Sequence, residues 1–127
     1  MLERSKWPEI RKAVPMPVYV VPHTALQDLD LQEKSLDHTT NITIATAVVL
    51  AANKFRTCVE ITNDSDVVIY LRLGQDAVLN TGIRLNASGG AYEINLSNLW
   101  KGPISAIHGG TGNKVLCIME IETRYAY

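Results

Sequence analysis

From Thr39 onward the chain alternates short apolar runs with clusters of turn-forming residues, which is the pattern of β-strands. In residues 67–73, for example, Val67, Ile69 and Leu71 fall on one face of an extended chain and Tyr70 falls on the other. We predict strands at residues 41–46, 47–50, 56–61, 67–73, 83–85, 91–96, 103–107 and 114–122. About seven or eight short strands at this spacing indicate an all-β fold, a small antiparallel β-sandwich or barrel.

Polar and glycine-rich turns separate these runs. The turn at residues 63–66 lies between two strand-like runs, 56–61 and 67–73, and so predicts a β-hairpin. The segment 109–113, Gly-Gly-Thr-Gly-Asn, predicts a second hairpin turn, in which glycine supplies positive φ angles. It lacks the GxxxxGK[ST] pattern of a phosphate-binding loop, and we expect no helix after it.

The final run, residues 114–122, is apolar on both faces, which predicts a strand in the middle of a sheet. Glu120 and Glu122 lie two positions apart and therefore share a face. We expect them to form a solvated edge rather than a catalytic pair. Trp100 is expected to close one end of the core, and Ile94 and Leu96 to share an apolar face with Tyr92.

The N-terminal part has a different composition. Four of the five prolines fall within residues 8–22, whereas all eight glycines lie at or after Gly74. The segment 14–22, Val-Pro-Met-Pro-Val-Tyr-Val-Val-Pro, can form neither a helix nor a central strand. It predicts an extended arm whose candidate subunit-contact residues are Val14, Met16, Val18, Tyr19, Val20 and Val21. An exposed apolar arm needs a surface to lie on; its own domain and a neighbouring subunit remain equal alternatives.

Residues 24–37 are polar and acidic with interspersed leucines, and we interpret them as a linker with a possible helical turn capped by Thr24. This divides the chain into an arm and linker at residues 1–38 and a β-sandwich domain at residues 39–127. A length of 127 residues fits one such domain.

Composition argues against several partners. The net charge of −1 gives no electrostatic basis for binding nucleic acid or a membrane surface. No apolar run approaches the roughly 20 residues that span a bilayer. The first residues lack the apolar core of a secretory signal, so we expect none.

The chain lacks the patterns that carry catalysis or metal binding. His23, His38 and His108 belong to no HxH, HExxH or Cys/His cluster, and we expect them on loop surfaces. No GxSxG motif is present. Cys58 and Cys117 are too far apart for a CxxC site and are expected to be small buried apolar residues, although a disulfide between neighbouring strands stays open. We predict no enzyme, no catalytic residue, no cofactor and no metal.

The segment from about Arg56 to Glu122 resembles a small β module of many structural proteins of tailed bacteriophages. The order of elements carries the resemblance: a strand ending in ITNDSD at 61–66, IYLRLG at 69–74, GIRL at 82–85, SGGAYEI at 88–94, GPISAI at 102–107, and a Gly-Thr-Gly turn before the last strand. The resemblance covers about half of the chain, and the first 39 residues lie outside it.

This resemblance implies a virion protein, made in the host cytoplasm, that decorates or cements the capsid. Its partners would be the major capsid protein or other virion proteins, and the expected state is a homo-oligomer, a trimer or dimer. A neck or tail accessory protein is one alternative. A β-sandwich module that binds glycans or host receptors is another, although it needs exposed aromatic side chains and only 6% of the residues are aromatic.

Overall fold

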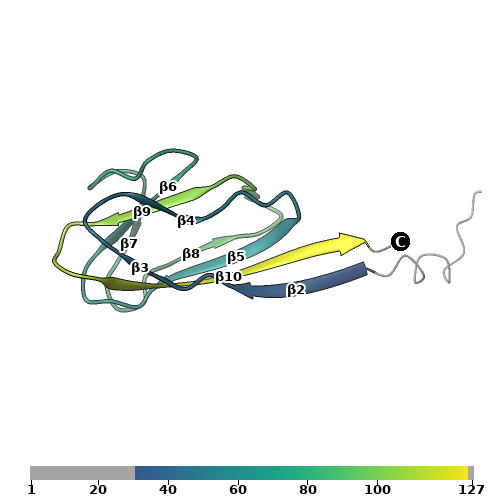
Figure 1. Cartoon of the computed structure of the whole chain (residues 1–127), viewed down its shortest axis with the longest axis horizontal. Helices are drawn as coiled ribbons and strands as arrows, with labels where there is room; N and C mark the ends of the chain where they lie inside the picture. The colour runs from purple at the N-terminus through teal and green to yellow at the C-terminus, as the bar shows by residue number, and fades with distance from the viewer. Residues whose placement is uncertain (1–30, 126–127) are drawn as a thin grey trace, which may run out of the picture. The chain divides into compact units, whose positions relative to one another are not determined.

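The computed structural model describes residues 31–125, which form an all-β structure (Figure 1). Within this range there are nine strands and no helix, and the strands form two antiparallel sheets. The prediction of a small antiparallel sandwich is therefore confirmed. The compact unit Glu33–Arg124 contains the sandwich. His23 and the predicted arm residues Val14, Met16, Val18, Tyr19, Val20 and Val21 lie outside the described residues.

The two sheets are built from strands that alternate along the chain. The first has the order β2 (Leu31–Asp37), β10 (Lys114–Tyr125), β5 (Arg56–Asn63) and β8 (Ala91–Ile94), and β3 (Thr40–Ile42) also pairs with β10. The second has the order β4 (Ala47–Leu50), β9 (Ile104–His108), β6 (Ile69–Leu73) and β7 (Ile83–Leu85). Most connections thus carry the chain from one sheet to the other.

Both predicted hairpins are wrong for this reason. β5 and β6 lie in different sheets, and so do β9 and β10, so residues 63–66 and 109–113 form arches between layers. Asn63 shows why the first connection is an arch. Its buried Nδ2 donates to the carbonyl oxygens of Val67 (2.7 Å), Leu85 (3.1 Å) and Asn86 (3.1 Å). One side chain therefore binds the chain to the opposite sheet, which a pattern of polar residues alone does not reveal.

The core lies between the two sheets. The predicted inward faces of β5 and β6 are confirmed, because Val59, Ile61, Ile69 and Leu71 are all fully buried. Each such side chain contributes about 1.5–3 kcal/mol through burial of apolar surface. They pack with other buried residues of both sheets: Ile42, Leu50, Leu85, Ile94, Ile104, Ala106, Leu116 and Ile118.

Trp100 closes the edge of this core as expected. It is partly buried against the core, and its Nε1 donates to the carbonyl of Pro103 at 3.0 Å. A Cβ at Gly102 would lie 2.6 Å from the indole, so the ring needs glycine there. Leu96, in contrast, is 77% exposed. It lies beyond the end of β8, in a turn that begins where the Asn95 side chain accepts a hydrogen bond from the Ser97 amide.

Two further predictions, for residues 24–37 and for the last strand, differ from the structure. Part of the predicted linker is a strand, because β2 pairs with β10 and the His38 amide donates to the Ile118 carbonyl at 2.8 Å. β10 does lie inside its sheet, as predicted, but it is not buried on both faces. Val115 and Met119 on its outer face are 37% and 42% exposed. Its inner face instead continues from apolar residues into two carboxylates.

Candidate functional site

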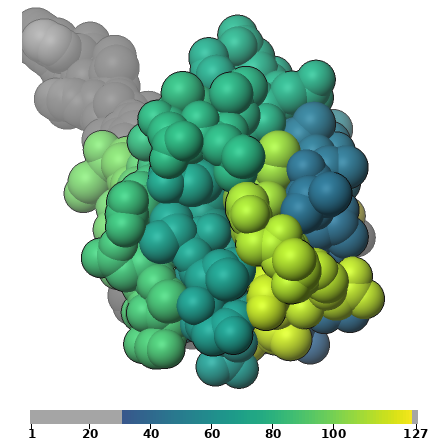
Figure 2. All heavy atoms as spheres, turned by 90° about the vertical axis from the view of Figure 1, so that its left-hand side faces the viewer, coloured from purple at the N-terminus to yellow at the C-terminus, as the bar shows by residue number. Residues whose placement is uncertain are grey.

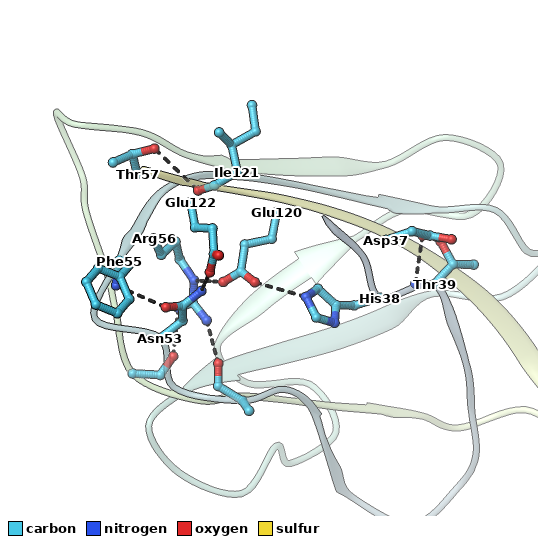
Figure 3. Close-up of polar contacts among 12 residues, drawn as sticks. Asp37, His38, Thr39, Asn53, Phe55, Arg56, Thr57, Glu120, Ile121 and Glu122 are labelled. Carbon is cyan, nitrogen blue, oxygen red and sulfur yellow. Dashed lines mark hydrogen bonds and ion pairs between the residues drawn. The ribbon is translucent and has the colours of Figure 1, made fainter. Parts of the chain in front are cut away.

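Three ionisable side chains from distant parts of the sequence meet inside the sandwich (Figure 3). Arg56 comes from the start of β5, Glu120 from β10, and His38 from the junction of β2 and β3. Arg56 Nε donates to Glu120 Oε2 at 2.6 Å, and Glu120 Oε1 lies 2.9 Å from His38 Nε2. Arg56 and Glu120 are 0% and 2% exposed, so this ion pair is removed from water.

The other donors of Arg56 bind backbone carbonyls. Nη1 donates to Trp100 (2.9 Å) and Gly102 (2.8 Å), and Nη2 donates to Ala51 (2.6 Å). A buried charge loses its hydration, and only a partner of opposite charge together with further hydrogen bonds offsets that loss. The guanidinium has both here, and it fastens two connecting segments to the sheet that contains Glu120.

A local turn directs His38 toward Glu120. The Asp37 carboxylate accepts hydrogen bonds from the Thr39 hydroxyl (2.6 Å) and amide (3.0 Å), and the Thr39 hydroxyl accepts one from the Ile118 amide (3.2 Å). The bonds from the Thr39 side chain and amide lower the pKa of Asp37. This turn separates β2 from β3, which both pair with β10, and places the imidazole beside Glu120.

Glu122 is the second buried carboxylate of β10. Its Oε1 accepts a hydrogen bond from Asn53 Nδ2, and its Oε2 accepts one from Arg124 Nε, both at 3.0 Å. The bond from Asn53, and then that from Arg124, lower the pKa of Glu122. The Arg124 guanidinium also stacks on the Phe55 ring, 4.0 Å from its centroid. The predicted solvated edge at Glu120 and Glu122 is therefore wrong, since both face inward toward cationic and amide partners.

The network is built to hold strands together. A histidine beside a carboxylate can act as a general base when a substrate reaches it in a cleft. Here the Glu120 carboxylate is occupied by Arg56 and His38, and Arg56 is occupied by carbonyls. The surface hollows described below are lined by other residues. What the arrangement can do is fix the positions of β2, β5 and β10.

His108 is buried, not on a loop surface as predicted. Its Nδ1 accepts a hydrogen bond from the Gly110 amide at 3.0 Å, so Nε2 is the nitrogen that donates to the Gly112 carbonyl at 2.8 Å. The ring thereby shapes the turn 109–113, in which Gly112 has a φ of 74°. His38 is partly exposed, with 37% of its side chain accessible, but it is bonded to Glu120.

The two cysteines lie half-buried on the outer face of the first sheet. Cys117 lies opposite Thr62, whereas Cys58 lies opposite Ile121, four residues further along β10. That offset corresponds to about 13 Å along the strand, beyond the roughly 7 Å between Cα atoms that a disulfide permits. The register thus eliminates the disulfide that the sequence left open, and both thiols are free. Burial, and then Glu93 and Glu60, raise the pKa of Cys58.

A groove of mixed polar and apolar lining lies on the surface beside the 109–113 turn, and we call it the turn groove. It has a volume of about 520 Å³ and is lined by Val67, Val68, Tyr70, Leu79, Asn80, Gly109 and Gly110. The Tyr70 hydroxyl donates to Asn80 Oδ1 at 2.9 Å, which leaves the ring and the aliphatic side chains as the apolar lining. Figure 2 shows this end of the molecule, with residues near 78 in green at the top and the yellow-green turn below.

Two smaller hollows adjoin the same loops. One shares Gly110 with the turn groove and includes Ile44, which is 65% exposed. The other is polar and is lined by Asp64, Ser65, Asp66, Ser88 and Gly89. Asp66 pairs with Lys114 at 2.7 Å, and this hydrogen bond and charge lower the pKa of Asp66. No pattern in the sequence identified the turn groove, because its lining comes from three separate connections.

Within residues 31–125, no three histidine, cysteine, aspartate or glutamate side chains gather as a metal site would require. The same part of the chain contains no helix of the length and hydropathy that crosses a membrane.

Comparison with known proteins adds little. The sequence matches no known family model, and no curated protein is significantly similar to it. One solved structure, from work on Bacillus endospore appendages that form a novel family of disulfide-linked pili, is similar at 14% identity and a TM-score of 0.45. The match covers 74% of this chain and 88% of that chain. We draw no conclusion about function from a likeness at this level.

We predict that Arg56→Met lowers the free energy of unfolding by about 3–5 kcal/mol, because it leaves Glu120 buried without its cation. The double variant R56M/E120M should lose less than the sum of the two single variants, since it removes both charges. Urea unfolding followed by circular dichroism measures both effects. Lys114→Met, at the partly exposed pair with Asp66, is the control and should cause no comparable loss. Strict additivity would contradict the coupling.

We also predict that E60Q/E93Q accelerates alkylation of Cys58 by iodoacetamide at neutral pH. The two carboxylates raise the pKa of this thiol, so their neutralisation increases the thiolate fraction, and the thiolate is the reactive form. The rate is measured by mass spectrometry in a C117S background. Glu33→Gln, on β2, removes one carboxylate elsewhere and is the control. An unchanged rate would show that burial alone governs Cys58.

Proposed function

We propose that this chain is a non-enzymatic structural protein, a subunit whose copies are joined within a larger assembly by the N-terminal arm. The observation that carries the proposal is the contrast between the inside and the outside of the sandwich. The ionisable groups of the central network are engaged with one another and with carbonyls. Exposed apolar side chains, in contrast, are distributed over the surface, and Leu79 and Ile44 are those that line the turn groove and the hollow next to it. Exposed apolar surface of this kind is typical of protein–protein contacts.

The arm supplies the second half of the proposal. Its sequence carries six apolar residues that need cover, and the sandwich carries apolar surface that also needs cover. Contact between the two buries both. Because every copy has an arm and a sandwich, this contact joins like subunits, and a symmetric homo-oligomer such as a trimer or dimer is the simplest closed product.

The specific assembly that we propose is the virion of a tailed bacteriophage, where the chain decorates or cements the capsid through the major capsid protein. Support for this comes from the resemblance of residues 56–122 to phage structural modules. A neck or tail accessory protein would use the same fold at lower copy number.

A glycan-binding role has less support. In the described part of the chain, Tyr125 is the aromatic residue among the large exposed apolar side chains, and Trp100 packs against Gly74 and Gly102. A sugar-binding platform needs aromatic faces that are open to solvent.

We predict that V18E/V20E in the full chain abolishes self-association, because it places charge on the apolar arm. Sedimentation velocity over a range of concentrations should show an oligomer for the unaltered chain and a monomer for the variant. S5E/Q27E adds the same charge at polar positions of the N-terminal part and should assemble normally. Normal assembly of V18E/V20E would contradict a role for the arm.

For the virion proposal, we predict that quantitative mass spectrometry of purified phage particles finds this chain at a copy number comparable to that of the major capsid protein. Such a ratio follows from decoration of the whole lattice. A handful of copies per particle would instead favour the neck or tail. Absence from the particles would contradict a virion role and leave the structural role in another assembly.

A further inference from the structure

The turn groove offers apolar side chains to a peptide segment. Val67, Val68, Tyr70 and Leu79 line it, together with Asn80 and the backbone of Gly109 and Gly110. Its volume of about 520 Å³ lies within the range of roughly 300–1,000 Å³ that is usual for binding pockets. The Tyr70 hydroxyl donates a hydrogen bond to the Asn80 side chain. An apolar occupant of the groove would therefore leave the Tyr70 hydroxyl and Asn80 Oδ1 bonded to each other.

Residues 14–22 of the chain have a matching sequence. In an extended chain, side chains two positions apart share a face. Val14, Met16, Val18 and Val20 would therefore form one continuous apolar face. Prolines at 15, 17 and 22 reduce the entropy that such a segment loses on docking, because they restrict it before it binds.

Charge is complementary at the ends of the two surfaces. Arg11 and Lys12 lie three and two positions before Val14, the first residue of the apolar segment. Asp64 and Asp66 precede Val67, the first lining residue of the turn groove, and line the adjoining polar hollow. Asp66 already pairs with Lys114, whereas no ion pair of Asp64 is seen among the described residues. Opposite charges flanking an apolar contact fix its register more than its affinity.

The direction of β2 favours a second copy as the source of the segment, because docking on the same copy would require residues 23–32 to run back almost fully extended over about 27 Å. The His38 amide bonds to the Ile118 carbonyl, and Lys34 acts electrostatically on Glu122, so β2 enters the sandwich near Glu122 and runs antiparallel to β10 (Figure 1). The turn groove borders residues 109–110, just before β10 begins at Lys114. Eight residues of β10 separate Lys114 from Glu122, about 27 Å. The chain thus enters each sandwich at the end opposite its own groove.

We infer that residues 14–22 of one copy dock in the turn groove of a second copy stacked end to end with the first. This rests on the proposed role of the arm in assembly and adds the surface that receives it. Leu79 and Tyr70 take the apolar face of the segment, and Asp64 faces Arg11 and Lys12. The contact is heterologous, because different surfaces of the two copies meet. It therefore closes into a ring or continues as a filament, according to the rotation between copies.

The experiment uses full-length chains and sedimentation velocity. Leu79→Glu places a charge in the groove at a residue that is 38% exposed, and Leu96→Glu makes the same change at a residue that is 77% exposed and lies in the turn after β8. We expect L79E to weaken self-association by about tenfold or more, and L96E to leave it unchanged. Circular dichroism and the melting temperature confirm that each variant is folded.

A second groove variant guards against misfolding of the first. A Cβ at Gly109 would meet the Leu79 methyl groups at 3.5 Å, which is ordinary contact, so Gly109→Leu adds a side chain to the groove next to Leu79. The charge contact has its own test. R11E/K12E and D64K should each weaken association, and R11E/K12E/D64K should recover it, because the swap restores opposite charges. Failure of this recovery would overturn the assigned register.

An equal mixture of two variants distinguishes docking on a second copy from docking within one copy. The V18E/V20E chain keeps its groove and the L79E chain keeps its arm, so the mixture should form a one-to-one heterodimer at concentrations at which each chain alone is monomeric. A mixture that stays monomeric would overturn docking on a second copy. If V18E/V20E fails to assemble but L79E and G109L assemble normally, the arm docks on a surface other than the turn groove. That result would contradict the groove assignment but not the role of the arm in assembly. If V18E/V20E assembles normally, the proposed function itself falls.

Discussion

The ion pair between Arg56 and Glu120 is the constraint on which the rest of the sandwich depends. β5 and β10 are neighbours in the first sheet, and the pair joins their inner faces at the point where the apolar core ends. Arg56 then reaches the carbonyls of Ala51, Trp100 and Gly102 in two other connections. Because an unpaired buried charge is so unfavourable, these segments are held in one arrangement, and β2 is joined to it through His38.

Buried polar side chains also explain why the chain forms arches between the sheets instead of hairpins. Asn63 and His108 are both fully buried, and each binds carbonyls or amides of the connection that follows its strand. Each therefore turns the chain away from its own sheet. The register that results places Cys58 and Cys117 too far apart to bond, and it brings residues 43–46, 74–82 and 109–113 together at the end that carries the turn groove.

Much of the fold could be predicted from the sequence, and the failures share one cause. Alternation of apolar and polar residues predicted most strands and the buried faces of β5 and β6, because every second side chain of a strand in a sandwich faces the core. The same rule misplaced Glu120, Glu122 and His108, since it treats polar side chains as solvated. The partners of Glu120 and Glu122, Arg56 and Asn53, become neighbours only after the strands pair, and no local pattern in the sequence indicates this. His108 binds the nearby Gly110 amide, a contact that depends on the conformation of the turn. The turn groove was missed for a related reason, as its lining comes from separate connections.

Arg56, Glu120 and Glu122 are buried ionisable side chains in an interior that is otherwise largely apolar. All three are bonded, while Leu79, Ile44 and Val48 are exposed. A network that fixes the strands, together with exposed apolar side chains, fits the structural role proposed above. His38 joins the end of β2 to the Arg56–Glu120 pair, so that the network connects β2, β5 and β10.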